Sequence, residues 1–156
     1  MKLLAIDPSL TNSGWAYFRD GQLYSCGNVP APGRHLPDRV RRLAQVMPAI
    51  ENAEFVFEWP QIYRDTRAKG DPNDLLALAA IVGAVLGAFP RAKATFVRPA
   101  EWKGQVPKKI MCARTFKRLN QTEQGLFLCR GYNAEGRGQS EDVLDAIGVG
   151  LYHLGR

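Results

Sequence analysis

Four carboxylates stand at positions where a buried acid is costly. Asp7 ends a short apolar run, and Glu58 ends an apolar-aromatic run further along the chain. Asp142 and Asp145 are three residues apart near the start of an expected helix, so they lie on one face of it. An unpaired acid inside an apolar segment is expensive, which favours a shared task for these residues.

Carboxylates that are held close together repel, and each raises the pKa of the others. A hard divalent cation removes this repulsion, and Mg²⁺ accepts carboxylate, water and phosphate oxygens. Two such ions about 4 Å apart can activate a water and stabilise the leaving oxygen of a phosphodiester. No histidine lies next to the four acids, which argues against zinc. We therefore expect two Mg²⁺ or Mn²⁺ ions on Asp7, Glu58, Asp142 and Asp145, which would be both the metal ligands and the catalytic residues.

Each acid also has an ordinary explanation. Asp7 could be a turn residue or a helix cap, and Asp142 and Asp145 could complement a helix dipole. Glu58 is harder to explain in this way because of its apolar neighbours. The combination favours a site, although Glu141 beside Asp142 leaves open which acid is the third ligand.

The elements that would position these acids can be read from apolar periodicity and turn residues. The expected strands are residues 2–7, 15–19, 22–27, 54–59 and 95–97, and the expected helices are residues 38–52, 72–89, 108–119 and 140–154. Asp20-Gly21 predicts a hairpin, Pro48 should end or kink the first helix, and Ser140 should cap the last. Three antiparallel strands followed by alternating helices and strands predict an α/β fold: a mixed five-stranded sheet, with two parallel strands, flanked by helices.

The length of 156 residues suits one domain over residues 1–156. Three widely spaced cysteines favour free thiols in a reducing compartment. The longest apolar stretch, residues 75–89, is shorter than the roughly 20 residues of a membrane span. We therefore expect a soluble cytoplasmic protein with no membrane partner.

Positive charge is concentrated in one segment. The chain has 21 Lys and Arg against 15 Asp and Glu, a net charge of +6. Residues 91–118 hold nine bases and one acid, which fits a phosphate-binding surface. Within it we expect Lys103, Lys108 and Lys109 to bind DNA, the last two at a helix start. Lys117 and Arg118 are more simply explained as solvated.

A polar loop, residues 60–71, follows Glu58 and contains bases beside an aromatic residue. Such interleaving suits exposed nucleobases, which stack on aromatic rings. We expect Tyr63 to stack on bases and Arg64 and Arg67 to contact DNA.

Residues 5–16 (AIDPSLTNSGWA) resemble the first motif of RuvC-like Holliday-junction resolvases, which have a ribonuclease-H-like fold. Glu58 and residues 141–150 (EDVLDAIGVG) match the later acidic elements in the same order. Bacterial members usually have glycine where this chain has Ser9, so the motif is closer to phage-type or divergent members.

The resemblance implies a homodimeric, structure-selective endonuclease that cleaves four-way DNA junctions with Mg²⁺ or Mn²⁺. It implies that Asp7, Glu58, Asp142 and Asp145 are the metal-binding residues. Gly83 and Gly87 on one helix face would allow close packing within the monomer or at a dimer contact. Three alternatives stay open: another ribonuclease-H-like nuclease acting on RNA/DNA hybrid, RNA or flapped DNA; an actin-like phosphotransferase, which would need a second lobe; and a non-catalytic nucleic-acid-binding module.

Overall fold

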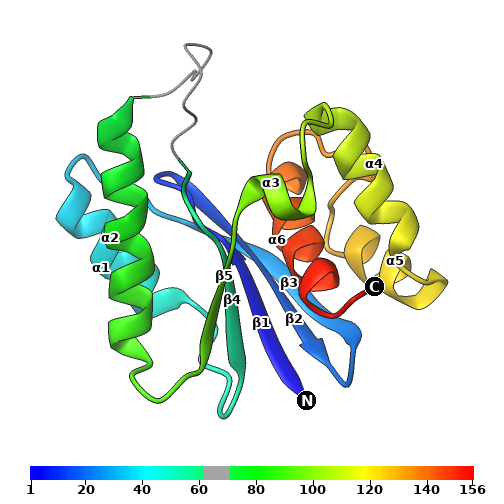
Figure 1. The fold of residues 1–156 in the computed structure, drawn as a ribbon, viewed down its shortest axis with the longest axis horizontal. Helices are drawn as coiled ribbons and strands as arrows, with labels where there is room; N and C mark the ends of the chain where they lie inside the picture. The colour runs from blue at the N-terminus through cyan, green and yellow to red at the C-terminus, as the bar shows by residue number, and fades with distance from the viewer. Residues whose placement is uncertain (62–70) are drawn as a thin grey trace.

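The computed structural model describes residues 1–61 and 71–156. Its centre is a five-stranded sheet in the order β3-β2-β1-β4-β5 (Figure 1). The strands are β1 (Lys2–Asp7), β2 (Asn12–Arg19), β3 (Gln22–Pro30), β4 (Glu54–Glu58) and β5 (Ala94–Val97). β1, β2 and β3 are antiparallel, whereas β4 runs parallel to both β1 and β5. The predicted mixed sheet is confirmed.

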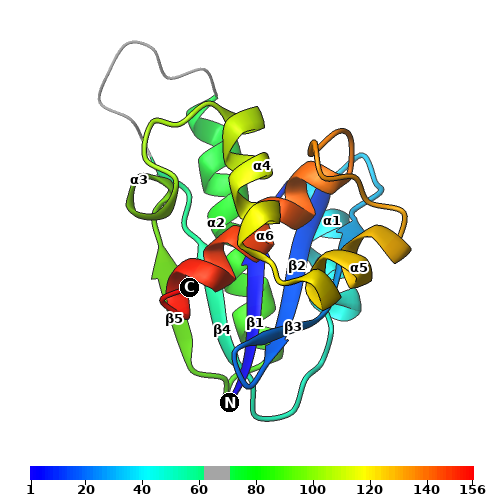
Figure 2. The ribbon, with the colours of Figure 1, turned by 90° about the vertical axis from the view of Figure 1, so that its right-hand side faces the viewer.

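Helices cover both faces of the sheet (Figures 1 and 2). On one face lie α1 (Leu36–Val46) and α2 (Pro72–Ala88), which pack against each other. The other face carries α3 (Pro99–Trp102), α4 (Lys108–Arg118), α5 (Gln121–Cys129) and α6 (Ser140–His153). α6 contacts four strands, β1 to β4, and is therefore the helix that is seated most directly on the sheet.

Two hydrophobic cores follow from the alternation of side chains along each strand. Leu3 and Ala5 of β1 face the core beneath α6, whereas Leu4 and Ile6 face the core beneath α1 and α2. Both faces of β1 are thus buried, which explains why its sequence is apolar almost throughout. After the exposed Lys2 at its start, the next polar residue of the strand is Asp7 at its carboxyl end.

Several predicted boundaries differ from the structure. α1 starts at Leu36 and ends at Val46, because Met47 takes the extended conformation that a following proline favours. β2 starts three residues earlier than predicted, and β3 runs on to Pro30. Ser140 does not cap α6: it is the first helical residue, and its hydroxyl accepts a hydrogen bond from the Asn133 backbone N–H at 3.0 Å.

Two short helices, α3 and α5, were not predicted. α5 has a capping box, in which the Asn120 side chain accepts from the Glu123 backbone and the Glu123 carboxylate accepts from the Asn120 backbone. The Glu123 carboxylate is buried, and its two oxygens also accept hydrogen bonds of 2.8 Å from the two terminal nitrogens of Arg156. Arg156 therefore fastens the end of the described chain to α5. No helix in the two described ranges has the length and apolar character needed to cross a membrane.

Candidate active site

Three separate elements bring the four acids to one edge of the sheet. β1 and β4 are parallel neighbours, with Ile6 opposite Phe57, so the next residues, Asp7 and Glu58, end their strands side by side. α6 then presents Asp142 and Asp145 from its first turns. The four carboxylates, distant along the chain, belong to one cluster.

A glycine lets α6 approach the end of β1. Gly14 of β2 is paired with Asp7, and a Cβ atom at Gly14 would overlap the backbone carbonyl of Asp142. Any larger residue at position 14 would therefore push the start of α6 away from the sheet. The sequence motif holds this glycine because the helix backbone passes directly over it.

Asp7 is in the least favourable electrostatic position of the four. Burial raises the pKa of Asp7 well above its usual value, and the negative charges of Glu58 and Asp145 raise it further. The ammonium group of Lys103 opposes these effects, and Asp142 adds to them. Asp142 thus acts on the charge of Asp7, whereas the Glu141 carboxylate pairs with Lys108.

Glu58 is held by two residues of the segment after β5. The Trp102 indole N–H donates a hydrogen bond of 2.7 Å to Oε2, and Lys103 Nζ lies 3.0 Å from Oε1. Burial raises the pKa of Glu58, and the charge and hydrogen bond of Lys103 only partly offset this. The Lys103 ammonium group also lies 3.5 Å from Oδ2 of Asp145, so it joins two of the four acids.

A second lysine enters the cluster from α4. Lys108 Nζ pairs with the Glu141 carboxylate and lies 3.5 Å from Oδ2 of Asp145. The nearby acids raise the pKa of Lys108 despite its partial burial, so the side chain stays charged. Lys103 and Lys108, predicted to bind DNA, thus both reach the carboxylates, Lys103 from a largely buried position and Lys108 from the exposed start of α4.

Asp142 has a different partner. Its Oδ2 accepts a 2.8 Å hydrogen bond from the side-chain amide of Asn12, at the start of β2. Burial raises the pKa of Asp142, and this hydrogen bond works in the opposite direction. The other amide atom, Asn12 Oδ1, is buried without a hydrogen-bond partner among the described residues.

The cluster suits a divalent cation in chemistry but is not a preformed chelate. Its donors are oxygens alone, which Mg²⁺ and Mn²⁺ prefer, and a cation would relieve the repulsion that helps to raise the pKa values of Asp7, Glu58 and Asp142. Within residues 1–61 and 71–156, however, no three His, Cys, Asp or Glu side chains are arranged to hold an ion together. Ammonium groups lie among the acids, so the side chains must turn before they can share a cation.

The remaining predicted DNA contacts fall in two places. Tyr63, Arg64 and Arg67 lie outside the described residues. Lys109 is exposed and lines a groove of about 810 Å³ between α4 and residues 134–138. Lys108 and Glu141 also line this groove, so it opens directly beside the carboxylate cluster.

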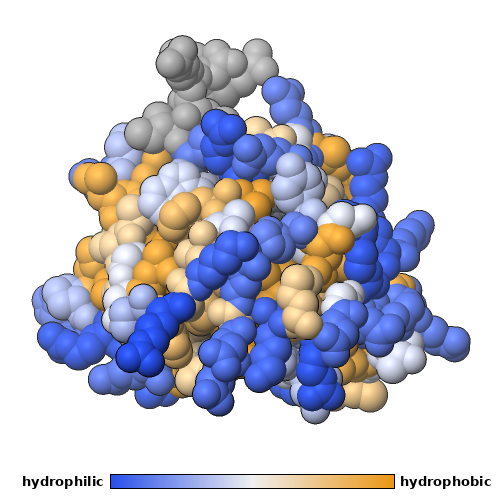
Figure 3. All heavy atoms as spheres, turned by 60° about the horizontal axis from the view of Figure 1, so that its bottom comes forward, coloured by the Kyte–Doolittle hydropathy of each residue, from blue (hydrophilic) through white to orange (hydrophobic). Residues whose placement is uncertain are grey.

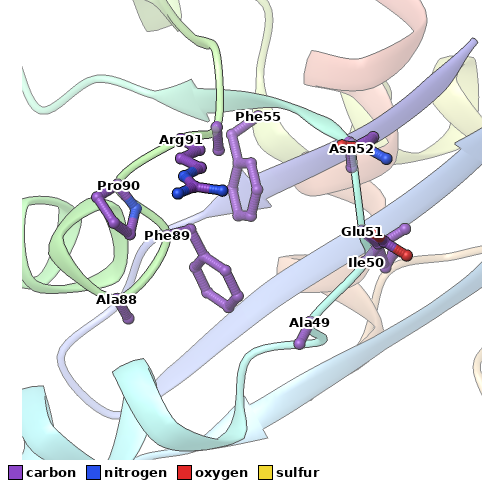
Figure 4. A pocket seen from close by; sticks show the side chains of 11 residues that line it. Ala49, Ile50, Glu51, Asn52, Phe55, Ala88, Phe89, Pro90 and Arg91 are labelled. Atoms are coloured by element: carbon purple, nitrogen blue, oxygen red, sulfur yellow. The ribbon is translucent and has the colours of Figure 1, made fainter.

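A second pocket, of about 450 Å³, lies at the opposite end of the sheet, between the α1–β4 and α2–β5 connections. Figure 4 shows Phe55 and Phe89 in this pocket, and their rings are 5.2 Å apart. Figure 3 brings this end of the molecule forward and shows hydrophobic side chains exposed among hydrophilic ones. None of the four acids lines the pocket, and it has no part in the site.

Sequence reasoning missed two residues that contact the acids, Asn12 and Trp102. Asn12 lies within the motif that contains Asp7, but its spacing reveals no contact with a helix 130 positions later. Trp102 follows Glu101 in an unpredicted helix, and an aromatic residue in a basic segment is more readily explained by nucleic acid.

No protein-family model and no curated protein matches the sequence. Solved structures do. The chain is similar to Thermus thermophilus RuvC in complex with a Holliday junction substrate, with a TM-score of 0.65, 19% identity, and 98% of this chain and 92% of that chain covered. It is also similar to another Thermus thermophilus RuvC structure, with a TM-score of 0.59, 18% identity, and coverage of 98% and 93%. At this level of identity the likeness establishes the fold, which is RuvC-like and ribonuclease-H-like.

Proposed function

We propose that this protein is a divalent-metal-dependent endonuclease that nicks four-way DNA junctions. The observation that carries the proposal is the meeting of Asp7, Glu58, Asp142 and Asp145 at one sheet edge of a RuvC-like fold. A structural role alone would not favour neighbouring acids of which three, Asp7, Glu58 and Asp142, have raised pKa values. That the similar Thermus thermophilus protein was solved with a Holliday junction supports the choice of substrate.

The four acids would hold two Mg²⁺ or Mn²⁺ ions. The ions would supply Lewis-acid activation of a water and stabilisation of the leaving oxygen. The protein's own part is to fix the carboxylates: β1 and β4 supply Asp7 and Glu58 from rigid strand ends, and α6 supplies the other two. Burial on the sheet side excludes bulk water from these groups, which strengthens their interaction with a phosphodiester.

Lys103 and Lys108 would change partners when a cation binds. Without it, their ammonium groups balance Glu58, Asp145 and Glu141. With the acids neutralised by ions, both lysines would be available for phosphate oxygens. We therefore propose that they bind DNA next to the scissile bond.

The groove beside the cluster would accept the backbone beyond that bond. Its rim carries Lys109, Lys117 and Arg137, and α4 starts at this point with backbone N–H groups that favour phosphate. Tyr63, Arg64 and Arg67, in the loop that follows Glu58 in sequence, remain proposed contacts to the unpaired bases of the crossover.

A four-way junction has two symmetric strands to cut, which suits a two-fold dimer. α2 offers a surface for it: Leu76, Ala80, Gly83 and Gly87 are exposed at helical spacing. Among the described residues, a Cβ at either glycine would meet no atom within 4 Å. The close packing that these glycines allow is therefore not used within the described part of the monomer, and we propose that this helix face pairs with a second copy.

A cleavage panel with Mg²⁺ tests the function. Purified protein would be incubated with a four-way junction, plain duplex, a flap and an RNA/DNA hybrid, each labelled on every strand. We expect paired nicks in opposing strands of the junction and little cleavage of duplex. The Asp7→Asn variant should bind the junction and leave it intact, whereas Asp20→Asn, an exposed acid of the β2–β3 turn, should cleave normally.

Each other outcome has a distinct meaning. Preferred cleavage of the hybrid or the flap would replace the junction with that substrate while keeping the site. Junction binding without scission under any divalent cation would support a binding module instead. Full activity of Asp7→Asn would overturn the assignment of the carboxylates.

A further inference from the structure

Asn12 presents an unusual feature beside the candidate site. Its Nδ2 donates to Asp142 Oδ2 at 2.8 Å, while its Oδ1 is buried with no hydrogen-bond partner among the described residues. A buried carbonyl oxygen without a donor costs about 1–3 kcal/mol, and native proteins rarely leave one unmatched. This oxygen therefore calls for a group that residues 1–61 and 71–156 do not supply.

The amide can have only one orientation while Asp142 is ionised. Turning it over would place Oδ1 against the Asp142 carboxylate, with two acceptors face to face. The hydrogen bond thus fixes which atom is left without a partner. Because both atoms belong to one small amide group, the unpaired oxygen lies next to the Asp142 carboxylate.

The surroundings define what this oxygen would accept. Asp142 is part of the cluster that includes Asp7 and Asp145, so the region is rich in oxygen acceptors. An anion is therefore disfavoured there, whereas a cation or its hydration water would satisfy both the carboxylate and the carbonyl. Neither Lys103 nor Lys108 donates a hydrogen bond to Asn12.

We infer that Asn12 is a further residue of the cation site. Its N–H group positions Asp142, and its Oδ1 is an oxygen acceptor for a hydrated divalent cation held by the same carboxylate. Asn12 starts β2 and is paired with Pro30 of β3, and two residues further on Gly14 is paired with Asp7, so the sheet places the Asn12 backbone near the end of β1. The inference rests on the proposed function, because it assumes that the carboxylates bind a cation.

Mn²⁺ binding to the full chain, without DNA, tests the inference. The free ion would be measured by electron paramagnetic resonance during titration of the wild type, Asn12→Leu and Asn12→Asp. Removing an outer partner of a metal ligand typically weakens metal binding 10- to 100-fold, and we expect this for Asn12→Leu. Asn12→Asp loses the donor but keeps an oxygen and adds charge, so it should bind Mn²⁺ at least as tightly as the wild type.

Asn28→Leu is the matched control. Asn28 also bridges the sheet to the segment before α6, through Gln139 O at 3.4 Å, but its Oδ1 already accepts from the Tyr132 hydroxyl at 3.3 Å. Its loss should leave the Mn²⁺ affinity unchanged, whatever it does to thermal stability. The thermal midpoint of each metal-free variant would be recorded to show that it is folded.

The outcomes separate the two proposals. If the wild type binds Mn²⁺ and Asn12→Leu binds it equally well, Asn12 has only a structural role and the further inference is overturned. Equal weakening in Asn12→Leu and Asn12→Asp would overturn the role of Oδ1, since only the N–H group would then matter. A wild type with no affinity for Mn²⁺ would overturn the proposed metal-dependent function as well.

Discussion

The indole N–H of Trp102 donates a 2.7 Å hydrogen bond to Oε2 of Glu58, although 44 residues separate them. The indole ring lies against α6, where a Cβ at Gly148 would collide with it. Glu58, on β4, is therefore fixed by a side chain from α3 that is itself supported by α6. The position of the Glu58 carboxylate therefore depends on both α3 and α6, which pack on each other.

The first prediction concerns the N–H group of Trp102. Trp102→Phe keeps an aromatic ring on Gly148 but removes the donor, so Glu58 should lose one of its two fixed contacts. We expect the single-turnover cleavage rate and the Mn²⁺ affinity each to fall about 10-fold, as is usual for partners of metal ligands. The fold should be retained, because the indole packing is only slightly reduced.

Trp15→Phe provides the comparison. Trp15 packs beneath Gly27 in the sheet and makes no hydrogen bond to any of the four acids. The Trp15→Phe variant should lose some stability and keep the cleavage rate and the Mn²⁺ affinity of the wild type. A Trp102→Phe variant that behaves like Trp15→Phe in both measurements would mean that the indole N–H does not position Glu58.

The second prediction tests the space that the Trp102 ring occupies, separately from the N–H group that donates to Glu58. Gly148→Ala keeps Trp102 but puts a methyl group where its ring lies, so the ring must move. Overpacking of this kind costs about 1–3 kcal/mol, which would be measured by urea unfolding. The cleavage rate should also fall, because the indole would leave Glu58. Gly125→Ala in α5, where no atom lies within 4 Å of the added Cβ among the described residues, should be neutral or slightly stabilising.

The third prediction is that the Asp7→Asn variant gains stability and loses cleavage activity. Burial and the neighbouring acids raise the pKa of Asp7 well above its usual value, so the folded state holds a proton that the unfolded state releases. The free energy of unfolding of the metal-free protein should therefore fall as pH rises from about 4, the ordinary aspartate pKa, through the raised value. Asp7→Asn should remove this fall and be more stable at pH 7 by on the order of 1 kcal/mol.

Urea unfolding at several pH values, with and without Mg²⁺, would measure this. Mg²⁺ should stabilise the wild type and reduce its pH dependence, because the cation favours the ionised carboxylates. Asp20→Asn is the opposite case: the amino-terminal ammonium group lowers the pKa of Asp20, so this variant should show no gain. A metal-free Asp7→Asn no more stable than the wild type at neutral pH would contradict the electrostatic account.

The strands and the β2–β3 hairpin were predictable because their signals are local. The apolar run of β1 and the Asp20-Gly21 turn belong to short segments, in which periodicity of two and turn residues are informative. The acids could also be singled out, because a carboxylate at the end of a buried strand conflicts with its surroundings. Asp7 and Glu58 lie side by side because β4 pairs in parallel with β1, and this long-range pairing is not encoded in a local pattern.

The contacts around the acids could not be predicted in this way. The hydrogen bond from Trp102 to Glu58 and that from Asn12 to Asp142 depend on how α3 and α6 sit on the sheet, which no local pattern encodes. Lys103 looked like one base among many in a positive segment. Its position between Glu58 and Asp145 emerges only when β5 and the turn after it are placed beside β4.

The fourth prediction follows from the position of Lys103 between Glu58 and Asp145. Lys103→Met should leave Glu58 without an ammonium group and leave Asp145 with Lys108 alone, although both acids are largely buried. Breaking such a pair costs about 3–5 kcal/mol when fully buried, and the partial exposure of Lys103 reduces this to about 2 kcal/mol. This loss of stability should become smaller as Mg²⁺ is added, because the cation then neutralises the Glu58 and Asp145 carboxylates in place of the lysine. Thermal midpoints over a Mg²⁺ titration would measure it, with Lys117→Met on the exposed side of α4 as the control.

The apparent Mn²⁺ affinity of Lys103→Met should rise several-fold, because the ion no longer competes with the ammonium group. This result would distinguish a competing lysine from one that merely packs. If the deficit of Lys103→Met stayed constant at all Mg²⁺ concentrations, the lysine and the cation would not share the carboxylates.

The last prediction tests stability away from the site. Arg156→Ala removes the guanidinium from buried Glu123, which would keep its backbone hydrogen bonds to Leu23 and Asn120. We expect a loss of about 2 kcal/mol in urea unfolding at pH 7, below the range for a wholly buried pair because Arg156 is partly exposed. Arg156→Lys should recover only part of it, because a lysine cannot contact both carboxylate oxygens in a fork.

The pH dependence of this loss has the opposite sign to that of Asp7. Burial raises the pKa of Glu123, but the hydrogen bonds from Arg156, Leu23 and Asn120 outweigh it and lower the pKa overall. The contribution of Arg156 should therefore be complete above about pH 4.3, the ordinary glutamate pKa, and should disappear as the pH falls through the lowered folded-state value. Mn²⁺ affinity should be the same in the wild type and in Arg156→Ala, because Glu123 lies outside the carboxylate cluster. A change in Mn²⁺ affinity would mean that α5 and the chain terminus influence the site through α6.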